Sequence, residues 1–203
     1  MLKIRKLHRY LGLIMLLPMI CWAITGTIFF IKPGYKNAYE MLKVKTYPLE
    51  QSITIPEHSS WQEVRVVKTI LGLHLLVRSD GPQQKTMHLK ADTLEPWLKP
   101  KEADIKRLIE DAFTGNQERY GVIESFDDNT AVTSTKVRVN FNWDTLSLSQ
   151  KGNDTDLINL IYKVHYLQWT PWDGVNQVLG VVGLLFLVTL SILGIRIYLR
   201  GRR

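Results

Sequence analysis

Two histidines flank the most apolar parts of this sequence, and a neutral imidazole is the side chain that most often binds a metal ion. His8 precedes a long stretch without charged residues, and His165 precedes a second such stretch. Both histidines are therefore candidate metal ligands. Alternatively, His8 anchors its helix among basic neighbours, and His165 packs against the aromatic residues that follow it.

A second pair of histidines offers weaker evidence for a metal site. His74 and His88 lie at almost equal distances from the turn-forming Gly81, so a hairpin would bring them face to face. Zinc sites normally use three or four protein ligands, and no third ligand is marked by its spacing here. We therefore expect this pair to pack across two strands. His58 lies beside Pro56 in a loop-like stretch that indicates no role.

The motifs of several common enzyme classes are missing from the sequence. It contains no Gly-x-Ser-x-Gly elbow, no HExxH pair, no Walker loop and no GxGxxG loop. Cys21 is the only cysteine and lies within an apolar stretch, which excludes an internal disulfide and a CxxC redox pair. The residues therefore leave open whether the chain is an enzyme.

Two uncharged stretches are each long enough to cross a membrane as a helix. They run over residues 10–31 and 175–195, and about 20 apolar residues span a hydrocarbon core about 30 Å thick. The first stretch exceeds the apolar core of a typical signal peptide, and no Ala-x-Ala-like cleavage site follows it. We therefore expect two uncleaved transmembrane helices, with one folded domain over residues 32–174 between them.

The formal net charge of +7 is concentrated at the two ends of the chain. Residues 1–9 and 196–203 each carry four Lys or Arg, whereas all 19 Asp and Glu lie between residues 40 and 173. Removing those eight basic residues from the total of 26 leaves 18 Lys and Arg against the 19 Asp and Glu, so the middle of the chain is almost neutral. Basic residues beside a span stay on the cytoplasmic side. Both basic tails are therefore expected in the cytoplasm, and the charge does not indicate a nucleic-acid partner.

The segment between the spans alternates strand-like and helix-like patterns. We expect, in chain order, a hairpin over 61–78 and 85–90 with its turn at 79–82, an amphipathic helix over 102–114, strands over 120–126, 132–140 and 146–149, and an amphipathic helix capped at Asn153 or Asp154. Strands followed by a helix, twice over, predict an antiparallel α+β domain, and the repetition suggests two pseudo-repeated halves.

Three segments resemble the PepSY-associated transmembrane proteins of bacterial inner membranes. They are LHRYLGLIMLLPMICWAITG at residues 7–26, VRVNFNWDTLSLSQ with the helix ending YKVHYLQW over residues 137–169, and LGIRIYLRGRR at residues 193–203. The resemblance implies an inner-membrane protein with a periplasmic PepSY-like domain. Larger members, with four spans, are similar to reductases that bind b-type haem and reduce ferric siderophores, and the first role proposed for the domain was inhibition of peptidases.

With this resemblance, His8 and His165 become candidate axial ligands of haem b. The predicted topology places His8 at the cytoplasmic end of the first span and His165 on the outer side, about 30 Å away. One iron cannot bind both residues, because each Fe–N bond is only about 2 Å long. We therefore expect a homodimer or a partner membrane subunit to supply the second ligand at each position.

Two functions follow from these residues and from the resemblance. In the first, the protein holds haem b and moves electrons toward an outer acceptor such as a ferric chelate, as a component or accessory subunit of a siderophore reductase system. In the second, it is a non-enzymatic module whose periplasmic domain binds a partner and regulates a peptidase or a transporter complex. The lipid bilayer is a partner in both.

Overall fold

The computed structural model describes residues 2–50, 52–55, 58–80 and 86–201. The chain divides into two compact units: a helical unit of residues 1–35 and 154–203, and a sheet unit of residues 36–153. Residues 154–174, which the sequence analysis assigned to the central domain, group with the long helices.

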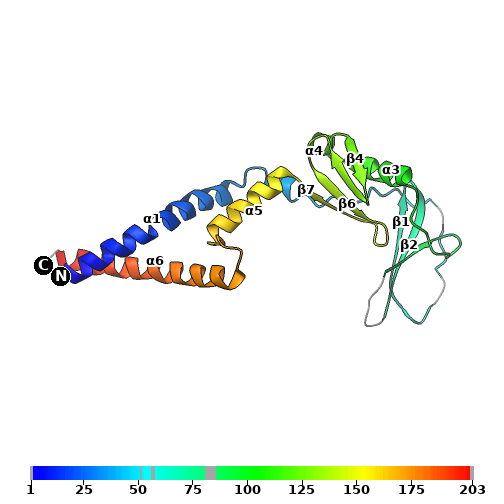
Figure 1. The fold of residues 1–203 in the computed structure, drawn as a ribbon. Coiled ribbons are helices and arrows are strands. Elements are labelled where there is room, and N and C mark those ends of the chain that lie inside the picture. Colours follow the sequence, from blue (N-terminus) through cyan, green and yellow to red (C-terminus); the bar gives the residue numbers. More distant parts are fainter. Residues whose placement is uncertain (1, 51, 56–57, 81–85, 202–203) are drawn as a thin grey trace. The chain divides into compact units, whose positions relative to one another are not determined.

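Two long helices form the helical unit, and they lie side by side in antiparallel directions (Figure 1). They are α1 (Leu2–Ile31) and α6 (Asp173–Gly201), both longer than the predicted spans because the basic ends continue each helix. Small residues allow close approach: Gly12 of α1 faces Leu190 of α6, and Gly194 of α6 faces the ring of His8. Both helices are long and apolar enough to cross a membrane.

A shorter helix, α5 (Asn153–His165), completes the helical unit and confirms the amphipathic helix predicted there. The ring of Tyr162 stacks on Phe29 of α1 with 4.5 Å between the ring centroids, and it also meets the edge of Tyr35. These aromatic contacts hold α5 against the last turn of α1 and the start of α2 (Tyr35–Ala38).

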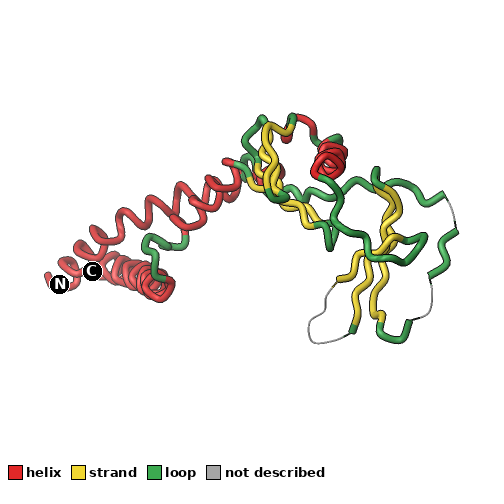
Figure 2. Tube along the Cα trace, turned by 45° about the vertical axis from the view of Figure 1, so that its right-hand side comes forward, coloured by secondary structure: helices red, strands yellow, loops and turns green. Residues whose placement is uncertain are grey.

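The sheet unit contains two antiparallel sheets (Figure 2). The first has the order β1-β2-β3, with β1 (Trp61–Thr69), β2 (Gly72–Ser79) and β3 (Thr86–Lys90). The second has the order β4-β5-β6-β7, with β4 (Ile123–Asp127), β5 (Thr130–Thr133), β6 (Arg138–Asn142) and β7 (Ser147–Lys151). Each strand pairs with its neighbour in the chain, so both sheets are meanders and need no crossover connection.

Helix α3 (Glu102–Phe113) confirms the predicted amphipathic helix and supplies much of the main core of the sheet unit. Its buried side chains cluster with inward residues of the second sheet, among them Val139 and Phe141. Strand β2 is buried on both faces, since Leu76 joins this core while Leu75 and Val77 join a second, smaller one. Two further helices are short: α2 (Tyr35–Ala38) and α4 (Gln117–Tyr120).

Turns divide two of the predicted strands and shift the start of a third. The predicted strand over 61–78 is two strands, because the chain turns at Ile70 and Leu71 before β2 begins. The predicted strand over 132–140 is likewise divided, because Lys136 adopts a left-handed conformation between β5 and β6. Helix α4 occupies the start of the predicted strand over 120–126. Part of the predicted turn at 79–82 lies outside the described residues.

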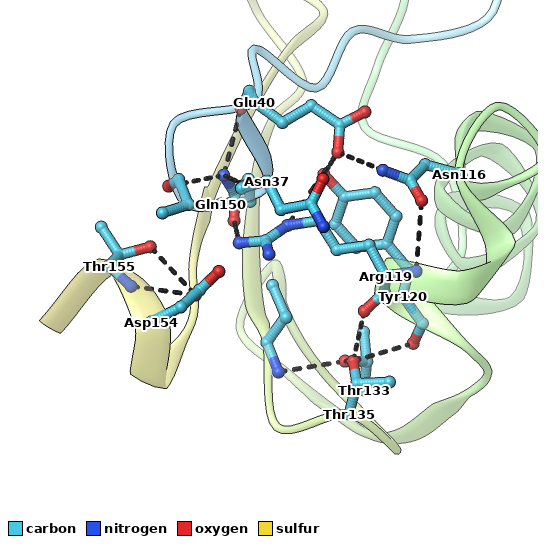
Figure 3. Close-up of polar contacts among 12 residues, drawn as sticks. Asn37, Glu40, Asn116, Arg119, Tyr120, Thr133, Thr135, Gln150, Asp154 and Thr155 are labelled. Atoms are coloured by element: carbon cyan, nitrogen blue, oxygen red, sulfur yellow. Dashed lines mark hydrogen bonds and ion pairs between the residues drawn. The ribbon is translucent and has the colours of Figure 1, made fainter. Parts of the chain in front are cut away.

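A polar network links the start of the sheet unit to α4 and β7 (Figure 3). The carboxylate of Glu40 accepts hydrogen bonds from Asn116 Nδ2 at 2.8 Å and from the Tyr120 hydroxyl at 3.2 Å. The buried guanidinium of Arg119 donates to Gln150 Oε1 at 2.7 Å, and Gln150 Nε2 donates to the Glu40 carbonyl at 3.1 Å. Burial, together with the Glu40 carboxylate, raises the pKa of the Tyr120 phenol.

Candidate functional site

His165, the last residue of α5, is held against α1 by two hydrogen bonds. The indole Nε1 of Trp22 donates to the backbone carbonyl of His165 at 2.6 Å. The hydroxyl oxygen of Thr25 lies 2.7 Å from Nδ1 of the imidazole. Trp22 and Thr25 are three residues apart on one helix and therefore share a face. Both the backbone and the side chain of His165 are thus fixed to α1.

The Thr25 hydroxyl decides which ring nitrogen of His165 carries the proton. The single hydroxyl proton is donated to the carbonyl of Cys21, 2.6 Å away and one turn earlier in α1. With the proton on that side, the same oxygen accepts a hydrogen bond from Nδ1–H of His165, because a hydroxyl has only one proton to donate. The proton on Nδ1 leaves the lone pair on Nε2, which forms no hydrogen bond with any described residue. Nε2 is therefore the nitrogen able to bind a metal.

Aromatic rings surround the imidazole of His165. The rings of Phe29 and Tyr166 are steeply inclined to it, with 4.9 Å and 5.4 Å between the ring centroids. Tyr162 stacks on both Phe29 and Tyr166, which joins the rings into one cluster. His165 itself is only half-buried, and Tyr166 is exposed, so the cluster has an open side.

The connection from α5 to α6 lies between the two long helices. Thr25 is six residues before the end of α1, a distance of about 9 Å along the helix axis. Leu167 approaches so closely that a Cβ on Gly183 would lie 2.9 Å from its Cδ1, and Gly183 is about 15 Å along α6 from Asp173. The sequence predicts that His165 lies on the outer side, ahead of the second span. In the structure its ring lies beside the apolar part of α1, because Trp22 and Thr25 bind it there.

His8 occupies a different place in the helical unit. Its ring lies against Gly194, where an added Cβ would meet Cε1 at 3.6 Å. Its Nδ1 is buried and has no hydrogen-bond partner among the described residues. Seventeen residues separate His8 from Thr25, which corresponds to about 25 Å along α1. One copy of the chain therefore keeps His8 and His165 apart, and the structure does not bring these two candidate ligands together.

His74 and His88 form a buried chain of hydrogen bonds in the sheet unit. His74 Nδ1 lies 2.8 Å from His88 Nε2, so the two rings do face each other across β2 and β3. His88 Nδ1 can only donate to the carbonyl of Trp143, at 2.8 Å, and its Nε2 must then accept from His74 Nδ1–H. The Thr69 hydroxyl, 2.7 Å from His74 Nε2, donates to that nitrogen and completes the chain.

His74 and His88 are both neutral near pH 7. Burial lowers the pKa of His74 to about 3, with a smaller contribution from His88, and burial also lowers the pKa of His88. The ring of His74 stacks on Trp97 with 4.1 Å between centroids. Every ring nitrogen is used in a hydrogen bond, and the described residues contain no cluster of three metal-binding side chains. The expectation of cross-strand packing agrees with this arrangement.

The long helices and the segment between them can be assigned to a family. The family described as PepSY-associated TM region matches residues 5–203. The chain belongs to this family. No curated protein and no solved structure matches the chain. This PepSY-associated protein is therefore a membrane protein with two spans, which flank a central domain of two antiparallel sheets and a helix.

The structure of this PepSY-associated protein gives roles to two residues that the sequence does not mark as functional. Trp22 and Thr25 position His165, although their types and spacing are equally typical of ordinary helix contacts. No signal in the sequence pairs them with a residue more than 100 positions away. The hydrogen bond from the Thr25 hydroxyl back to the Cys21 carbonyl of its own helix is the contact that relates Thr25 to the tautomer of His165.

Proposed function

We propose that this PepSY-associated membrane protein binds haem b and serves in electron transfer toward an acceptor outside the membrane, such as a ferric chelate. The observation that carries the proposal is the orientation of His165. A metal-binding histidine almost always donates its other ring N–H to a neighbouring group, which fixes the tautomer and the ring orientation. The Thr25 hydroxyl accepts that bond in this chain and leaves Nε2 with its lone pair.

The residues around His165 fit a haem group in chemistry. The imidazole is half-buried, has aromatic neighbours, and belongs to the unit that contains both spans. Haem supplies a one-electron redox centre when bound. In this role His165 would be an axial ligand, while Trp22 and Thr25 would hold it in place.

One chain supplies only one imidazole at this position, so the second axial ligand has to come from another chain. A symmetric dimer would bring two copies of His165 together on one side and two copies of His8 on the other. The buried, unpaired Nδ1 of His8 is consistent with a second ligand position. A partner membrane subunit with its own histidine would serve equally.

Absorbance of the full chain purified in detergent and reconstituted with haem tests the proposal. We expect a Soret band that His165→Ala reduces strongly and that His8→Ala reduces separately. His58→Ala is the matched control, because His58 is an exposed histidine of the sheet unit and its replacement should leave the band unchanged. Absence of any Soret band after reconstitution would overturn the proposal and favour a module that binds a protein partner.

A further inference from the structure

We propose that the basic end of the helical unit is a binding site for the phosphate group of an anionic phospholipid. Three arginines line one shallow hollow there: Arg5 from α1, and Arg196 and Arg200 from α6. The first turns of α1 and the last turns of α6 lie side by side in both views (Figures 1 and 2). The hollow therefore depends on the antiparallel pairing of the two helices.

The register of the two helices explains why these arginines meet. His8 faces Gly194, and Gly12 faces Leu190 one turn further along α1. Extending this antiparallel pairing by one turn toward the helix ends brings Arg5 level with the turn that contains Arg196 and Arg200. The small side chain of Gly194 permits the close approach on which this convergence depends.

No acidic side chain among the described residues of the helical unit balances the positive charge of this hollow. No described residue forms an ion pair with Arg5, Arg196 or Arg200. The acidic residues of the unit are Asp154, Asp156 and Asp173, all remote from this end. Asp173 and Arg196 are separated by 23 residues of one helix, or about 35 Å. Three guanidinium groups without a carboxylate partner among the described residues favour binding of an external anion, and a phosphate accepts paired hydrogen bonds from such groups.

Apolar residues in the same hollow favour a lipid over a free phosphate ion. Ile4 and Ile197 complete its lining, one from each helix. The exposed apolar sides of α1 and α6 continue from this point along the part of each helix that crosses the membrane. A phospholipid presents a phosphate joined to acyl chains and therefore matches both parts of the surface, as in other basic pockets between membrane helices. The site does not depend on haem binding.

The test measures which lipid the full chain retains. The detergent-purified protein is incubated with equal amounts of phosphatidylglycerol and phosphatidylcholine, and native mass spectrometry measures the ratio of the two bound lipids. We expect phosphatidylglycerol to be favoured, and each of Arg5→Gln, Arg196→Gln and Arg200→Gln to reduce that preference about fivefold. Arg9→Gln is the matched control, since Arg9 lies one turn away on α1 and does not line the hollow.

Two results would overturn the proposal. One is an equal loss of preference in Arg9→Gln and in the three site variants, which would mean that the basic end acts only through its overall charge. The other is displacement of phosphatidylglycerol by millimolar inorganic phosphate, which would assign the hollow to a free anion. Circular dichroism shows whether each variant has kept its helices, and the lipid ratio is measured only on variants that have. If one of the three site variants fails to fold, the other two test the proposal.

Discussion

The hydroxyl oxygen of Thr25 lies 2.7 Å from Nδ1 of His165, although 140 positions separate the two residues in the chain. One end of this contact belongs to the first membrane-spanning helix, and the other is the last residue of α5. The contact therefore fixes the imidazole within the helical unit and also sets its tautomer.

Thr25→Val tests whether this contact supports haem binding. Valine has nearly the same shape but offers no oxygen, so Nδ1 of His165 loses its partner and the ring loses its fixed tautomer. Removal of such a supporting group usually lowers metal affinity by about 10–100-fold. We expect a loss of haem affinity in this range, measured by absorbance titration of the full chain, together with a shifted reduction potential.

Thr27→Val is the matched control for that variant. The Thr27 hydroxyl also bonds back to its own helix, to the carbonyl of Ala23 at 2.8 Å, but it is exposed and contacts no histidine. Its replacement should leave haem affinity and potential unchanged. If both variants bind haem as the natural chain does, Thr25 has no positioning role.

Gly183→Leu tests the packing of the α5–α6 connection between the spans. A Cβ at this position would already lie 2.9 Å from Leu167 Cδ1 and 3.5 Å from the Trp22 ring, so a leucine has no space. Gly26→Leu is the control, because a Cβ on Gly26 meets nothing within 4 Å. We expect Gly183→Leu to lower the thermal unfolding midpoint in detergent by several degrees, since overpacking costs about 1–3 kcal/mol. Equal midpoints in the two variants would contradict this packing.

Arg119→Met tests the polar network of the sheet unit. The arginine is 8% exposed and donates to Gln150 Oε1, which would lose its charged partner in a partly buried position. Removing the hydrogen-bond partner of such a polar group costs about 1–3 kcal/mol. Denaturant unfolding of the full chain should show this loss, whereas Arg107→Met, at an exposed position of α3, should change stability by less than about 0.5 kcal/mol. A loss below 1 kcal/mol in Arg119→Met would mean that the network contributes little.

Patterns that extend over many residues of the sequence predict the helices well. The uncharged stretches over 10–31 and 175–195 lie within α1 and α6, and helix α3 ends one residue before its predicted end. These elements depend on periodic burial or on uniform apolarity, both of which are properties of the residues themselves. Short turns were missed where no Asn-Gly or Pro-Gly pair marks them, as at Ile70 and Leu71.

The candidate site was only partly predictable. His165 was recognised by its type and by its position before the second span, but its partners could not be. Trp22 and Thr25 lie on another helix, and a contact between distant elements depends on how those elements pack. The convergence of Arg5 with Arg196 has the same origin, since it follows from the register of α1 against α6.

The pH dependence of stability tests whether the hydrogen-bonded His74 and His88 of the sheet unit are neutral in the folded protein. The pKa of both His74 and His88 is lowered in the folded protein, to about 3 for His74. Their contribution to stability is therefore complete above the unfolded value of about 6.5 and is lost as the pH falls below it. Between pH 6.5 and pH 5 we expect the free energy of unfolding to fall by about 2 kcal/mol from His74 alone.

Two measurements separate this effect from the titration of other groups. Denaturant unfolding is followed between pH 7.5 and pH 5, above the range in which ordinary carboxylates titrate. His58→Gln should keep the slope, because His58 is exposed, whereas His74→Gln should be less stable at pH 7.5 and show a smaller slope. In the natural chain, NMR signals of the His74 ring should not shift between pH 7.5 and pH 5. Protonation of that ring at pH 6 in the folded protein would show that the hydrogen-bonded chain from Thr69 to Trp143 does not hold it neutral.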